Sequence, residues 1–229
     1  MPMNSTAELA ERFDNAVTRA LELLARRRPL FHSEADFQFE FAWELRSTLP
    51  DCEIRLERPV LIPDGRTLYV DIMLGLAGLW FAVELKYIKA GLVTEFNGED
   101  YVLKTQGAQD LSRYGILKDM FRIESLVAAG IAVGGCSLTL SNDPSLWKEP
   151  ATPYMGAQVS NDDAFRVHEG RVISGALDWC QPAQPGTSHP PSGFHLTGTY
   201  TSRWRDYSSL PQHRNADFRY LKLASAFDE

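Results

Sequence analysis

The residues of this chain that could do chemistry lie inside two apolar segments. Glu84 and Lys86 interrupt the run of residues 79–87, and Asp71 interrupts the run of residues 68–74. Charged side chains are almost never fully buried without a partner, so their place in apolar strands marks them as candidates for a site.

The alternation of side chains along a strand puts Glu84 and Lys86 on one face. If a hairpin turns on Leu76-Ala77, Asp71 lies opposite Ala82 and diagonal to Glu84, on the same face and roughly 7–8 Å away. A one-residue slip would place the two carboxylates on opposite faces. In the expected register they are hard oxygen ligands for Mg²⁺, with Lys86 beside the bound water.

Such a set predicts hydrolysis of phosphodiesters. A bound Mg²⁺ polarises the phosphodiester and lowers the pKa of its water, and an ammonium group can orient that water or stabilise charge on the phosphate. The alternative is a structural ion pair between Lys86 and one of the carboxylates.

The pattern Asp71 followed by Glu84-Leu85-Lys86 resembles the active-site motif of the PD-(D/E)XK nuclease superfamily. Val70 stands where the motif name has proline. The resemblance covers about residues 33 to 140 and implies an α/β fold with a restriction-endonuclease-like core, in which helices flank a central mixed sheet. It implies Mg²⁺ as cofactor, with Mn²⁺ as a substitute.

The resemblance also implies a glutamate from the helix before the strands. Glu34 is the expected third metal ligand beside Asp71 and Glu84, and Glu40 and Glu44 are its competitors. Glu34 belongs with Gln38 to the N-terminal extension of an apolar helix stripe, so both should point toward the core.

A supporting residue is expected on the helix that follows Lys86. Gln106, Gln109 and Arg113 share one face of that helix at spacings of three and four. Family members often place a Gln and a Tyr there, so Gln106 is the expected supporting catalytic residue and Tyr114 the second choice. An ordinary polar helix face would show the same spacing.

The elements expected to position these residues follow from capping signals and periodicity. Ser5 and Glu8 form a capping-box pattern for a first helix that ends at the basic residues 26–28, and Ser33 begins a second helix that runs to Pro50. The remaining core elements are strands at 52–61, 67–74 and 79–88, a helix at 104–129 and an apolar strand at 131–140.

The composition after residue 141 favours β structure. A hairpin is expected over residues 164–179, turning near Glu169-Gly170, with another strand near residues 194–200. The predicted organisation is therefore a core at 1–140, including the N-terminal helix, and a C-terminal β-rich extension at 141–229 packed on it.

Composition narrows the class of protein. The 229 residues are 44% hydrophobic, which is enough for a full core, and the net charge of −7 disfavours non-specific coating of nucleic acid. The three cysteines have no paired spacing for zinc or redox chemistry. No apolar run could span a bilayer or serve as a signal peptide, so we expect a cytoplasmic protein that does not bind membranes.

The sequence thus predicts a metal-dependent nuclease with nucleic acid as its partner, DNA as the expected substrate, and a homodimer as one possible assembly. The competing hypothesis is a binding protein for nucleic acid or protein that keeps the nuclease fold without cleaving.

Overall fold

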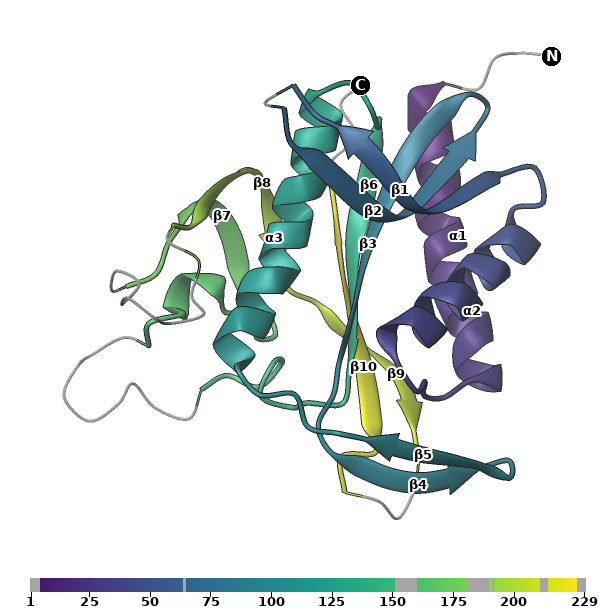
Figure 1. The fold of residues 1–229 in the computed structure, drawn as a ribbon, viewed down its shortest axis with the longest axis vertical. Coiled ribbons are helices and arrows are strands. Elements are labelled where there is room, and N and C mark those ends of the chain that lie inside the picture. Colours follow the sequence, from purple (N-terminus) through teal and green to yellow (C-terminus); the bar gives the residue numbers. More distant parts are fainter. Residues whose placement is uncertain are drawn as a thin grey trace.

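A six-stranded mixed sheet divides the molecule into three layers in the computed structural model (Figure 1). Helices α1 and α2 cover one face of this sheet, and α3 covers the other together with the two-stranded sheet β7–β8. The structure describes residues 5–225 except 64, 151–159, 181–189, 191 and 211–213.

The helices begin where their caps predict. Helix α1 (Thr6–Arg27) starts at the reciprocal Ser5–Glu8 capping box, and α2 (Glu34–Thr48) starts at Ser33, whose side chain accepts from the Asp36 N–H. Helix α3 (Gln109–Ala128) starts five residues later than the sequence predicted, because Ala108 adopts the left-handed conformation at φ 57°. None of the described helices is long and apolar enough to cross a membrane.

The central sheet joins segments from both halves of the chain. The predicted meander of three antiparallel strands is present, the predicted strand after the helix pairs with it in parallel, and two strands from the C-terminal part then extend the sheet. In sheet order these are β1 (Glu53–Leu61), β2 (Thr67–Leu76), β3 (Leu79–Ile88), β6 (Gly134–Ser141), β10 (Asp217–Ala224) and β9 (Trp204–Ser209).

Two hairpins differ from the prediction. The sequence reading missed β4 (Leu92–Phe96) and β5 (Glu99–Leu103), which turn on Asn97-Gly98, a pair suited to positive φ at both positions.

The hairpin predicted over residues 164–179 is wrong. Strand β7 (Val172–Leu177) pairs instead with β8 (Phe194–Thr201), and Asp163–Phe165 forms a 3₁₀ turn. Phe165 is fully buried and packs on Tyr114 of α3 with ring centroids 5.1 Å apart, which holds this segment away from a ladder.

Strand β3 contributes to the cores on both sides of the sheet. Phe81, Val83 and Leu85 belong to the apolar cluster under α1 and α2, and Ala82 and Ile88 belong to the cluster under α3. Glu84 and Lys86 therefore face α3, as the strand alternation predicted.

Candidate active site

The register between β2 and β3 differs from the predicted one by two residues. The hairpin turns on Ala77-Gly78, at φ 49° and 85°, and Ile72 pairs with Val83. One step further along this register Asp71 stands opposite Glu84, not opposite Ala82. Because a shift by two residues preserves the face of each side chain, the two carboxylates still share one side of the sheet.

Beyond Ile72 the strands separate, and side chains satisfy the N–H groups along the edge of β3. The Leu85 N–H donates to Asp71 Oδ2 at 2.6 Å, the Tyr87 N–H to Glu34 Oε2 at 2.8 Å, and the Lys89 N–H to Gln106 Oε1 at 2.9 Å. Three residues that the sequence proposed for the site thus accept from alternate N–H groups along β3 and one residue past its end.

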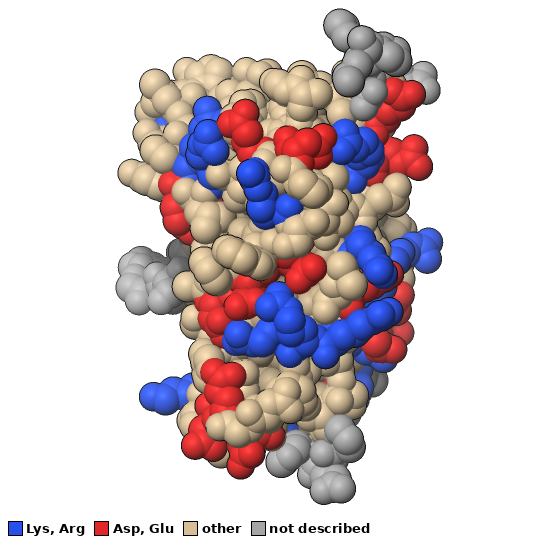
Figure 2. Space-filling model, turned by 90° about the vertical axis from the view of Figure 1, so that its right-hand side faces the viewer, with Lys and Arg blue, Asp and Glu red and all other residues tan. Residues whose placement is uncertain are grey.

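The two competitors of Glu34 point elsewhere. Glu40 and Glu44 form ion pairs with Arg27 at 3.0 Å each, between α2 and the end of α1. In Figure 2 the basic side chains on this face form a band with acidic side chains around it. Glu34 is the helix glutamate that reaches β3, although the residue as a whole stays exposed rather than turning into the core.

An irregular residue in β1, without a shift of register, leaves the backbone of Asp71 open to α2. Glu57 adopts φ 48°, and the β1–β2 ladder omits the pair between Glu57 and Asp71. Gln38 Nε2 donates to both the Asp71 carbonyl and Glu57 Oε1 at 2.8 Å, so the expectation that Gln38 turns inward is met.

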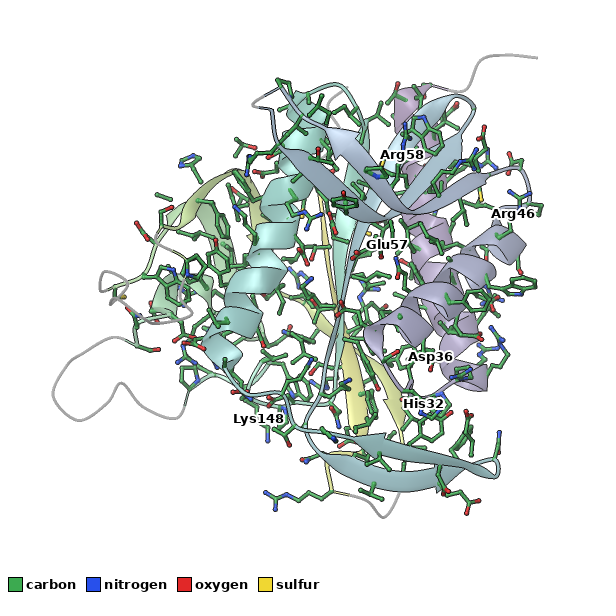
Figure 3. The ribbon with its side chains drawn as sticks, in the orientation of Figure 1. His32, Asp36, Arg46, Glu57, Arg58 and Lys148 are labelled. Carbon is green, nitrogen blue, oxygen red and sulfur yellow. The ribbon has the colours of Figure 1, made fainter. Side chains whose placement is uncertain are left out.

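Figure 3 shows Glu57 and Arg58 on opposite sides of β1, with Glu57 toward the centre of the molecule. Positive φ at a non-glycine residue costs about 1–3 kcal/mol and often occurs at functional sites.

Helix α3 supplies a partner for each charged residue of β3. Lys86 Nζ lies 2.9 Å from Asp119 Oδ2, and Arg122 Nη2 lies 3.0 Å from Glu84 Oε1. The ion pair of Lys86 is therefore made with Asp119, and not with Asp71 or Glu84 as the alternative interpretation had it.

The sequence reading missed Asp119 and Arg122. A signal for Asp119 was present, because it lies three residues after Ile116 and four before Ile123, on the apolar stripe of α3. A charged residue on a buried stripe indicates a partner in the adjacent layer. Asp119 is 3% exposed and Glu84 is 1% exposed.

The buried charges of the site do not balance. Asp71, Glu84 and Asp119 could carry three negative charges against the two positive charges of Lys86 and Arg122, which leaves one negative charge in excess. Burial, and then repulsion from Asp119, raises the pKa of Glu84 to about 9. Burial also raises the pKa of Asp71 and of Asp119. Burial alone would lower the pKa of Lys86, but Asp119 raises it, so Lys86 remains an ammonium.

A cavity of about 430 Å³ gives access to one end of this cluster. Its lining includes Glu34, Lys86 and Gln106, together with Ser112 and Gly115 of α3. The Lys86 side chain is 30% exposed. Lys86 is therefore the group that links the buried charges with a space that a substrate could enter.

The prediction that Gln106 lies on a face of the helix after Lys86 is wrong. Gln106 precedes α3 and lies in the loop after β5, where its side chain pairs with the backbone of Lys89. Arg113 of the same predicted face forms an ion pair with the buried Asp162, and Tyr114 stacks on Trp179 at 5.5 Å. Neither lines the cavity described above.

Asp71 and Glu84 lie on one side of the sheet and are carboxylates, the donor type that Mg²⁺ prefers. In the part of the chain that the structure describes, no group of three or more His, Cys, Asp or Glu side chains is placed to hold a metal ion. Mg²⁺ commonly uses one or two protein carboxylates and keeps several waters. Within the same described residues, Glu84 Oε1 is buried and makes no hydrogen bond, and the ion pair with Arg122 at 3.0 Å is the contact that a metal ion would have to replace.

Comparison with known proteins identifies no relative. No family model, no curated protein and no solved structure matches this chain.

Proposed function

We propose that this protein is a Mg²⁺-dependent nuclease with a restriction-endonuclease-like core, and that it hydrolyses phosphodiester bonds of DNA. One observation supports this above all: Asp71, Glu34 and Gln106, from three separate segments, accept from alternate backbone N–H groups along β3 and just past its end. The carboxylate of Glu84 and the ammonium of Lys86 lie on that strand, and Lys86 lines a cavity.

Asp71 and Glu84 would hold the metal ion, and Glu34 is bound two residues further along the β3 edge than Asp71. When bound, Mg²⁺ would polarise the phosphodiester and lower the pKa of its water. Lys86 orients the water or stabilises charge on the phosphate, because Asp119 keeps it protonated at one end of the cavity. Gln106 fixes the backbone at Lys89 and thereby the cavity wall.

Cleavage assays test the proposal on single- and double-stranded DNA and RNA, with Mg²⁺, with Mn²⁺ and with EDTA. We expect cleavage of DNA only with a divalent ion, and a loss of about 100-fold or more in Asp71→Asn, Glu84→Gln and Lys86→Ala. Glu95→Gln is the matched control, because it removes an exposed carboxylate on β4. Absence of metal-dependent cleavage of every substrate would contradict the proposal.

Binding without cleavage is the second candidate function. The observation that favours it is that Glu84 and Lys86 already have partners in Arg122 and Asp119, as in a structural ion-pair network. Under this hypothesis calorimetry detects no Mg²⁺ or Mn²⁺ binding, and Lys86→Ala unfolds the protein. Metal binding that Glu84→Gln abolishes would decide against it.

A further inference from the structure

The Arg122 guanidinium lies where three acidic side chains stabilise a positive charge. It lies 3.0 Å from Glu84 Oε1, and its charge also acts on Asp71 and Asp119. The same Nη2 group donates to the Tyr69 carbonyl of β2. Arg122 therefore spans the opening where β2 leaves β3, next to the carboxylates that would hold the metal.

We propose that Arg122 takes the place of the divalent cation in the metal-free protein and gives up Glu84 when the cation binds. This inference rests on the proposed function. A Mg²⁺ ion binds a carboxylate oxygen at about 2.0–2.1 Å, so an undisturbed guanidinium would be held within a few ångströms of a double positive charge. That repulsion in a partly desolvated site favours separation of the two cations.

The burial of the two partners decides which one moves. The Glu84 side chain is 1% exposed and sits within the sheet, whereas the Arg122 side chain is 25% exposed and lies on a helix surface. Arginine can turn its head group to solvent while its stem stays packed. The Nη2 group that lies against Glu84 also donates to the Tyr69 carbonyl, so when the guanidinium leaves the carboxylate another of its N–H groups has to take over the bond to β2.

The consequence is that Arg122 sets the metal affinity of the site. In its absence the carboxylates would attract a divalent ion more strongly, because no resident charge would have to be displaced. A lysine at this position would keep the charge on a shorter and more flexible head group, and would compete less well for Glu84.

Calorimetric titration with Mn²⁺ tests this on the full chain as wild type, Arg122→Gln, Arg122→Lys and Lys118→Gln. Lys118→Gln is the matched control, because it removes the same charge from α3 one turn before Arg122. The Lys118 ammonium packs over the Phe121 ring at 4.3 Å. Protons compete with metals for carboxylates, so affinities are compared at the upper end of a pH series. We expect Kd to fall about tenfold or more in Arg122→Gln, less in Arg122→Lys, and under about threefold in Lys118→Gln.

A second readout does not depend on the variants. Crystal structures of the wild type with and without Mn²⁺, located by anomalous scattering, should show the Arg122–Glu84 pair only without the ion. An intact pair beside bound Mn²⁺ would overturn the inference, and so would an unchanged or weaker affinity in Arg122→Gln. In both cases the metal site of the proposed nuclease would survive. If Mn²⁺ bound neither wild type nor Arg122→Gln, the inference and the proposed nuclease would both be wrong.

Discussion

The Asp71 carboxylate accepts a 2.6 Å hydrogen bond from the backbone N–H of Leu85, so a proposed metal ligand also closes the gap between β2 and β3. Asparagine keeps an acceptor oxygen at this position and alanine does not. We expect Asp71→Ala to destabilise the fold by about 1–3 kcal/mol through an unsatisfied buried N–H, and Asp71→Asn by less. Urea unfolding measures both. Equal losses would mean that this hydrogen bond contributes little.

The raised pKa of Glu84 predicts how stability depends on pH. From the ordinary value of 4.5 up to about 9, the folded protein retains a proton that the unfolded chain has released. The folded state then binds more protons, so the free energy of unfolding should fall as pH rises through this window. Urea unfolding in EDTA over a pH series checks the slope. Glu84→Gln should flatten the dependence of the free energy of unfolding on pH, and Glu95→Gln should not. The same slope in both variants would mean that the pH dependence does not come from Glu84.

Lys86→Ala should separate metal binding from chemistry. Because the change removes a positive charge beside the carboxylates, Mn²⁺ affinity should hold or rise while cleavage is lost. It also leaves Asp119 buried without its partner, which should cost about 2 kcal/mol, less than a fully buried pair, because Lys86 is 30% exposed. Restoration of stability in Lys86→Ala/Asp119→Asn would confirm that coupling. A fall in Mn²⁺ affinity in Lys86→Ala would instead mean that Lys86 helps to hold the metal-binding carboxylates in position.

Gly135 marks a close approach between the two parallel strands of the sheet. A Cβ atom at this position would lie 2.1 Å from the Ala82 carbonyl oxygen, and neither backbone can shift without breaking the β3–β6 ladder. We expect Gly135→Ala to lower the free energy of unfolding by about 3 kcal/mol. Gly107→Ala, with nothing within 4 Å of its Cβ, is the control and should have a much smaller effect. Similar losses in both would mean that the contact with Ala82 is not the cause, because the lower chain entropy of alanine in the unfolded state favours folding.

Residues 1–140 expressed alone should not form a soluble, cooperatively folding unit. Strand β10 completes the sheet next to β6, and its Phe218, Leu221 and Leu223 are buried in the clusters on both sides. Removing it would expose the backbone edge of β6 and apolar surface on both faces. Circular dichroism and thermal unfolding of the fragment provide the measurement. A sharp unfolding transition would show that the first part folds independently.

Local signals in the sequence were enough to fix several features of the site. Strand alternation placed Glu84 and Lys86 on one face, because a side-chain period of two follows from extended backbone alone. Ser5 and Ser33 marked the starts of α1 and α2, because a cap acts within four residues of itself. The family resemblance called for a glutamate from the helix before the strands, and Glu34 does reach β3 at the Tyr87 N–H, although it stays exposed where the helix stripe predicted that it turns inward.

Only the tertiary structure decided which groups meet those residues. Asp119 and Arg122 pair with β3 across a layer boundary, and the left-handed turn at Ala77-Gly78 set the register of Asp71. Periodicity specifies the face a side chain takes, but its partner depends on how separate elements pack and on the free energy of the whole core. The repulsion between Glu84 and Asp119, which raises the pKa of Glu84, exists only once those elements have come together.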